Sequence, residues 1–145
     1  MAEITIRRAV TEDAEAITHC IDQAYAAYRD ALPDLPDVSE GVAEDIEENT
    51  VFVATLDGRL VGCLILIQTA LALKIANVAV SPSMRGTGLG RLLLEKADAE
   101  ARRLGVSELS LTTHTSMTGN VSLYQHLGWS LTARTANKVE MSKPV

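Results

Sequence analysis

The sequence is poor in cysteine. It holds two cysteines in 145 residues, Cys20 and Cys63, and no CxxC pair or Cys/His ligand spacing accompanies them. This arrangement excludes a disulfide framework and a structural zinc site, and it predicts two reduced thiols. No metal site is expected.

The chain also lacks a positive field and a long hydrophobic run. Its formal net charge is -6, which excludes nucleic acid as a partner because a phosphate backbone is held by clustered Lys and Arg. The longest uncharged run, residues 60–73, is too short to span a bilayer. Residues 1–8 alternate and carry two arginines where a secretory signal has apolar residues. We therefore expect a cytoplasmic protein that binds no membrane.

What the chain does have is enough apolar material for one core. Hydrophobic residues make up 47% of the sequence, which fits a single domain over residues 1–145. Apolar periodicity predicts strands at 3–8, 51–56, 60–67, 73–80, 106–112, 129–133 and 138–141. It predicts four helices: one behind Thr11 as N-cap, one that begins after Ser39 and ends near Asn49, one from 89 to a stop at Gly105, and one at 119–127.

The order of these elements predicts a mixed α/β (α+β) sheet. Asp57-Gly58 suits the positive backbone angles of a tight hairpin turn, so the strands beside it are expected to be antiparallel. Three successive strands form an antiparallel meander, and one strand-helix-strand crossover then makes a parallel pair.

A glycine-rich turn, Arg85-Gly86-Thr87-Gly88-Leu89-Gly90, lies between a strand and a helix. Such glycines let the backbone approach a ligand, and the first N–H groups of the helix are free to bind an anion. A Walker loop is excluded because no Lys-Ser or Lys-Thr pair follows. A dinucleotide fingerprint needs a third glycine at Arg91 and an acid closing the next strand, whereas Glu108 opens it.

The turn matches the [RQ]xxGxG/A motif of the GNAT superfamily of acetyltransferases, which this sequence resembles. Residues 77–82, Asn-Val-Ala-Val-Ser-Pro, are similar to the family's fourth strand. Asn120 with residues 123–129 resembles its N…LYxxLGF segment, with Trp129 as the aromatic. The resemblance implies a mostly antiparallel sheet of six to seven strands, about four helices and one parallel crossover.

The resemblance also implies a site for acetyl-coenzyme A as cosubstrate. In this family the N–H groups of the turn hold the pyrophosphate, which here points to Arg85, Gly86, Thr87, Gly88 and Gly90, with Arg91 adding charge. The main chain of the fourth strand pairs with the pantetheine arm between the fourth and fifth strands. The residues involved there are Val78 and Val80, and Asn120 touches the coenzyme.

Tyr124 is the candidate catalytic residue. It lies four residues after Asn120, so both share one helix face, and the resemblance places this tyrosine by the coenzyme sulfur. A phenol with a reference pKa of about 10 stays protonated at neutral pH and can donate a proton to the departing thiolate. The alternative is a packing role for this aromatic side chain.

The sequence leaves the identity of the general base open. Relatives often carry an acidic residue just before the 77–80 run, and here that position is Ala76. We therefore predict that the amine proton leaves through water, with Glu44, Glu47 or His114 as assisting groups. Cys63 is interpreted as a core residue rather than a nucleophile, since it lies in an apolar strand.

The predicted activity is transfer of an acetyl group to an amine by direct attack in a ternary complex. An alternative is a catalytically inactive acyl-coenzyme A binding module, and a weaker one is a dinucleotide-binding oxidoreductase. The acceptor is a small-molecule amine or a protein or peptide amine, since no motif selects between them. A homodimer is one open alternative for the assembly.

Overall fold

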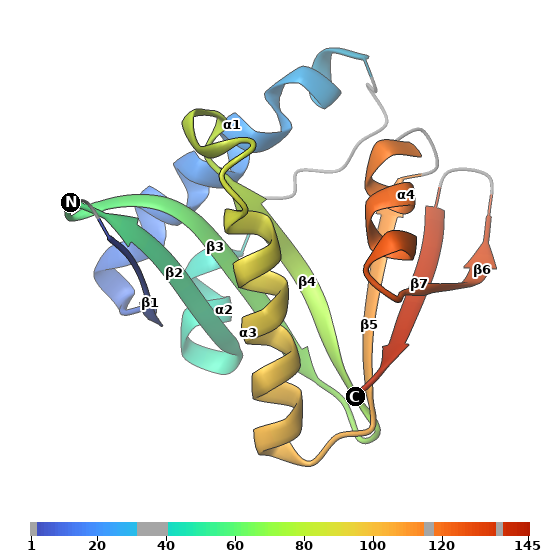
Figure 1. Ribbon diagram of the computed structural model, residues 1–145. Coiled ribbons are helices and arrows are strands. Elements are labelled where there is room, and N and C mark those ends of the chain that lie inside the picture. Colours follow the sequence, from blue (N-terminus) through green and yellow to red (C-terminus); the bar gives the residue numbers. More distant parts are fainter. Residues whose placement is uncertain (1–2, 32–40, 115–117, 136–137) are drawn as a thin grey trace.

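The computed structural model describes residues 3–31, 41–114, 118–135 and 138–145 (Figure 1). Seven strands form one sheet in the order β1-β2-β3-β4-β5-β7-β6. The strands are β1 Ile4–Arg8, β2 Thr50–Leu56, β3 Arg59–Gln68, β4 Ala72–Val80, β5 Glu108–His114, β6 Ser130–Arg134 and β7 Lys138–Pro144. The helices are α1 Ala14–Ala31, α2 Val42–Glu48, α3 Leu89–Leu104 and α4 Thr118–His126.

The first four strands are antiparallel neighbours, and β2, β3 and β4 form the predicted three-stranded meander. β2 and β3 are joined by Asp57 and Gly58, whose φ angles of 52° and 77° are both positive, as a two-residue type I′ turn requires. The predicted hairpin is therefore confirmed. β4 and β5 form the parallel pair, connected by α3, and α3 ends at Gly105 in a left-handed conformation, as predicted.

The predicted fold class is confirmed: a mostly antiparallel sheet with one parallel crossover and four helices. β5 begins at Glu108, two residues later than the predicted strand, and β7 lies between β5 and β6. The second helix ends at Glu48 with Asn49 as its C-cap, which agrees with the predicted end near Asn49, whereas Ser39 lies outside the described residues.

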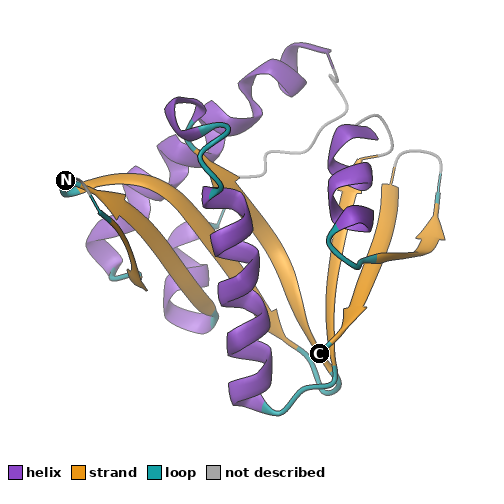
Figure 2. Cartoon of the chain, in the orientation of Figure 1, coloured by secondary structure: helices purple, strands orange, loops and turns teal. Residues whose placement is uncertain are grey.

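Helices cover both faces of the sheet (Figure 2). α1 and α2 pack behind the first strands, and α3 and α4 lie on the front face. Each face has its own buried core because the strands alternate their side chains. The front core includes Leu64, Leu66, Leu93, Leu109 and Trp129, and the rear core includes Ile17, Ile21, Val53 and Cys63.

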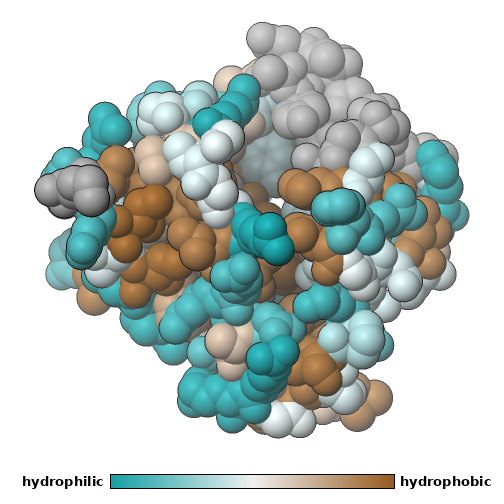
Figure 3. All heavy atoms as spheres, viewed as in Figure 1, coloured by the Kyte–Doolittle hydropathy of each residue, from teal (hydrophilic) through white to brown (hydrophobic). Residues whose placement is uncertain are grey.

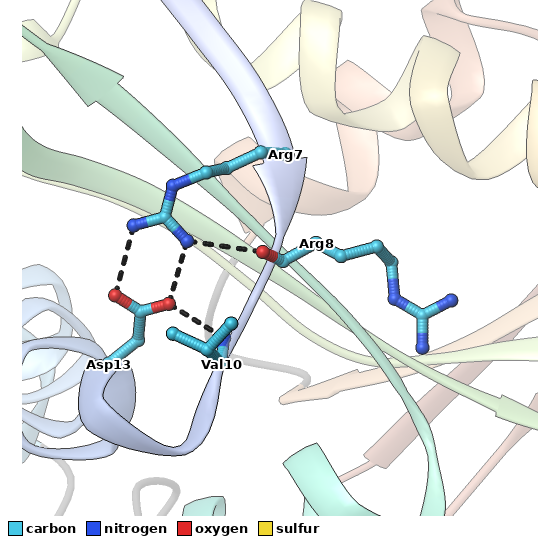
Figure 4. Close-up of polar contacts among 4 residues, drawn as sticks. All are labelled: Arg7, Arg8, Val10 and Asp13. Atoms are coloured by element: carbon cyan, nitrogen blue, oxygen red, sulfur yellow. Dashed lines mark hydrogen bonds and ion pairs between the residues drawn. The ribbon is translucent and has the colours of Figure 1, made fainter.

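The start of α1 differs from the prediction. Thr11 begins a short 3-10 turn, Thr11–Asp13, and the predicted N-cap at Thr11 is wrong. Val10 is the N-cap instead, and Oδ2 of Asp13, the third residue of the turn, accepts the Val10 N–H at 2.8 Å (Figure 4). Arg7 donates to both oxygens of Asp13, at 2.8 and 3.0 Å, which ties β1 to the first helix.

A β-bulge in β4 shapes the middle of the sheet. Ile65 of β3 pairs with Asn77, but the next residue pairs with Ile75, so Ala76 is the extra residue. The parallel pairing of β4 with β5 ends at the same level, with Ile75 opposite Leu111. Beyond this point the two strands diverge (Figure 1). Within the described residues, no helix is long and apolar enough to cross a membrane.

Candidate active site

The glycine turn opens α3 with two left-handed residues. Gly86 and Gly88 have φ angles of 79° and 85°, which side chains rarely adopt. A Cβ added at either glycine would meet no atom within 4 Å, so the space beside the turn is open. Gly88 is the N-cap of α3 and has no side chain to cap the helix. The turn therefore presents backbone donors to a ligand.

The hydrogen bonds of the turn show which N–H groups are available. Arg85 N–H donates to Pro82 O and Thr87 N–H to Met84 O, both at 3.3 Å. The first helical bond runs from Leu92 N–H to Gly88 O, which leaves the N–H groups of residues 89–91 at the open end of the helix. The donors best placed for an anion are thus those at the start of α3, where the helix dipole also favours negative charge.

A cavity of about 220 Å³ lies beside this turn. Five of the predicted site residues line it: Val78, Val80, Arg85, Gly90 and Tyr124. The other lining residues are Ala24, Tyr25, Ala79, Leu94 and Leu123. The surface is hollowed between α3 and α4, with hydrophobic residues at the margin of the hollow (Figure 3). The cavity therefore combines an apolar wall with one cationic side chain at its end.

A second, smaller cavity lies where β4 and β5 diverge, and we call it the cleft. Its lining residues are Tyr25, Ile75, Ala76, Asn77, Val78, Leu111, Thr112, Thr113 and Tyr124. Three of them, Tyr25, Val78 and Tyr124, also line the larger cavity. The two spaces are therefore adjacent, and they share one boundary.

Tyr124 is held at this boundary by its neighbour in space, Trp129. The ring centroids lie 5.8 Å apart with a 59° tilt, and Trp129 N–H donates to the Tyr124 carbonyl at 2.9 Å. Burial raises the pKa of the Tyr124 phenol above its ordinary value, because a low-dielectric surrounding disfavours the phenolate. The hydroxyl therefore stays protonated at neutral pH.

Other predicted residues lie outside these two cavities. Arg91 lines a separate groove with Trp129 and Lys143, and its Nε lies 3.6 Å from Glu95. Gly86, Thr87 and Gly88 form the turn itself. Asn120 belongs to α4 and His114 ends β5, but their side chains lie outside the described part of the chain.

The proposed assisting carboxylates lie away from the cleft. Glu44 and Glu47 are exposed on α2, which packs against α1 and β2, and neither lines either cavity. Cys63 is fully buried, as predicted. A hydrogen bond with Cys20 and burial raise the pKa of the Cys63 thiol well above its usual range, so it is a poor nucleophile.

Sequence reasoning missed Tyr25 as a site residue. Its spacing with Ile17 and Ile21 fits the apolar stripe of α1, which indicates a packing position and no functional role. In the structure it lines both cavities from the rear helix. The only available signal was its place near the end of the stripe, where a helix reaches the edge of the core.

Comparison with known proteins agrees with the geometry. The Acetyltransferase (GNAT) family model matches residues 16–129. The chain therefore belongs to the GNAT acetyltransferase family, and it is an acetyltransferase.

Relatives in sequence and in structure support this assignment. The uncharacterised N-acetyltransferase CT2212 of Chlorobaculum tepidum is 34% identical over 113 residues, which cover 77% of this chain and 69% of that protein. The IAA acetyltransferase of Azospirillum brasilense is 31% identical over 138 residues, which cover 90% of this chain and 86% of that protein. The structure of the ribosomal-protein-S18-alanine N-acetyltransferase of Escherichia coli has a TM-score of 0.83 at 25% identity, and the match covers 99% of this chain and 94% of that one.

One further structural neighbour was solved with a ligand. The PaiA N-acetyltransferase of Thermoplasma acidophilum, in complex with coenzyme A, has a TM-score of 0.83 at 20% identity and covers 99% of both chains. At this identity the likeness shows the shared fold.

Proposed function

We propose that this acetyltransferase moves an acetyl group from acetyl-coenzyme A to an amine by direct attack in a ternary complex. The observation that carries the proposal is the larger cavity, which collects five residues predicted from the sequence. They come from β4, the glycine turn, α3 and α4, and the cavity adjoins the cleft that opens between β4 and β5.

The residues present fit a coenzyme with a pyrophosphate and a long arm. The N–H groups at the start of α3 and the guanidinium of Arg85 supply the donors for the pyrophosphate. Gly86, Thr87 and Gly88 shape the turn, and Arg91 adds positive charge. Beyond Ile75, β4 has no ladder partner on the side of β5, so the backbone of Val78 and Val80 is available to pair with the pantetheine arm. Asn120 is proposed as a further contact to the coenzyme.

Acetyl-coenzyme A supplies the activated acyl group and a thiolate leaving group. Tyr124 is proposed to donate the proton that the departing sulfur needs. Its raised pKa keeps that proton available, and its place at the boundary of the two cavities puts it between coenzyme and acceptor. Ala76 offers no carboxylate on β4, so the amine proton is proposed to leave through water.

The test is a screen of amine acceptors with acetyl-coenzyme A, in which the release of free thiol measures turnover. The panel contains alkyl amines, amino acids, aminoglycosides and peptides with a free N-terminus. Turnover with at least one class, together with saturable coenzyme binding in calorimetry, supports the proposal. Tight coenzyme binding with no turnover on the whole panel would instead support an inactive acyl-coenzyme A binding module.

A further inference from the structure

The rear face of β5, β7 and β6 has no described helix over it, in contrast to the rear face of β1 to β3 (Figure 1). A shallow cavity of about 250 Å³ lies there, which we call the rear cavity. Its lining residues are Lys74, Glu108, Ser110, Leu111, Thr112, Thr132, Glu140, Met141 and Ser142. It shares Leu111 and Thr112 with the cleft, so the two spaces are adjacent.

The strand register places Glu140 at the level where the cleft opens. Ile75 and Leu111 are the last pair of β4 and β5, and the next residue of β5, Thr112, pairs with Glu140 of β7. Val139 and Met141 are buried in the front core, so Glu140 between them points to the rear face. Glu140 therefore lies one strand away from the cleft, on the rear face of the sheet.

Three charged residues line the rear cavity: Lys74 on β4, Glu108 on β5 and Glu140 on β7. Lys74 pairs with Ser110 in register, so its nearest carboxylate on this face is Glu108, two residues along β5. Glu140 lies two strands from Lys74 and at a different level. In the described part of the chain, the carboxylate of Glu140 has no ion-pair partner. Its charge is available to a ligand.

The cleft itself is lined, among the described residues, by uncharged side chains only. No charged side chain among these described residues balances an ammonium ion, which favours the neutral form of the reactive amine, whereas a second amine on the same molecule can keep its charge outside. Strands in a sheet are about 4.8 Å apart, so the middle of the cleft and Glu140 are separated by one to two strand spacings, about 5–10 Å. A short diamine spans the lower part of this range.

We propose that Glu140 is a specificity-determining residue that selects amine acceptors carrying a second positive charge, which it binds while the reactive nitrogen enters the cleft between β4 and β5. This inference rests on the proposed function and names the class of acceptor. Because Glu140 is exposed, the pairing is weak and sensitive to salt. The net charge of -6 adds a general attraction for cations.

The experiment compares 1,4-diaminobutane with 1-aminobutane, which differ by one ammonium group. Thiol release is measured at saturating acetyl-coenzyme A, at low salt and in 0.5 M NaCl. Binding of 1,4-diaminobutane to the protein with coenzyme A is measured in parallel by calorimetry. The variants are Glu140→Gln and, as the matched control on the same face, Glu108→Gln.

We expect the unaltered protein to prefer the diamine in kcat/KM and Glu140→Gln to lower this preference about three- to fivefold. Glu108→Gln should retain the preference, and 0.5 M NaCl should reduce it. An unchanged preference and unchanged diamine binding in Glu140→Gln would overturn the inference, as would an equal loss in Glu108→Gln. If no amine releases thiol, the proposed function fails, and the binding comparison alone still decides whether Glu140 holds the diamine.

Discussion

Tyr25 of α1 and Tyr124 of α4 line the same two cavities from opposite faces of the sheet. This is feasible because β4 and β5 separate after Ile75 and Leu111, so side chains from the rear and front helices reach one space. Tyr124 carries the proton-donor role in the proposed mechanism. Tyr25 forms the opposite wall, between the larger cavity and the cleft.

The first prediction concerns the glycine turn. Gly88→Leu should abolish binding of acetyl-coenzyme A, because a side chain would strain a residue at φ 85° and fill the open space beside the turn. Arg85→Ala should weaken binding by about 1.5–3 kcal/mol through the loss of a charged hydrogen bond. Both affinities are measured by calorimetry.

Gly58→Leu is the control for this prediction. Gly58 also has a positive φ, 77°, and open space around it, but it lies in the β2–β3 hairpin. The variant should carry similar backbone strain and still bind the coenzyme. Unchanged affinity in both Gly88→Leu and Arg85→Ala would show that the coenzyme binds elsewhere.

The second prediction concerns the proton donor. Tyr124→Phe should keep the affinity for the coenzyme and lower turnover about 10²–10⁴-fold, because only the hydroxyl is removed and the ring still packs on Trp129. Single-turnover kinetics measure the chemical step directly. A Phe variant with full turnover would assign Tyr124 to packing alone.

The third prediction concerns pH. An alkyl amine has a pKa near 10.4 and an α-amine one near 8, and each must be neutral to attack. Since Ala76 supplies no base on β4, kcat/KM should rise with pH along the acceptor's own ionisation and shift downward for the less basic amine. A fixed apparent pKa with every acceptor, lost on mutation of Glu44, Glu47 or His114, would contradict this and identify the base.

The fourth prediction concerns stability. Hydrogen bonds from Arg7 hold the pKa of Asp13 below its ordinary value, so its contribution is present above the unfolded pKa of about 3.9 and is lost as pH falls through the lower folded pKa. Asp13→Asn should therefore lower the free energy of unfolding by about 1 kcal/mol at pH 7. The difference from the unaltered protein should shrink below about pH 4.

Urea unfolding at the two pH values measures this effect, and Glu12→Gln is the control, since Glu12 is exposed in the same turn. A Glu12 variant that loses as much stability as the Asp13 variant would refute the role of Asp13. So would an Asp13 deficit that persists unchanged at pH 3.

The features that the sequence by itself determined are those governed by local geometry. The Asp57-Gly58 pair predicts the hairpin between β2 and β3, and Gly105 predicts the end of α3. Both features depend on positive φ angles, which few residues adopt. The glycine turn before α3 is similarly local, since free N–H groups occur at the start of any helix. Neighbouring motifs then sufficed to indicate the family.

The tertiary structure alone decided how the cleft is formed. The extra residue at Ala76 is visible only through its pairing with β3, and the divergence of β4 from β5 only through their register. Tyr25 in sequence is one apolar position in a helical stripe, and Glu140 is one charge in a short strand. Their places beside the cleft depend on contacts between distant segments, because burial and strand pairing, rather than local propensity, determine which side chains face the same space.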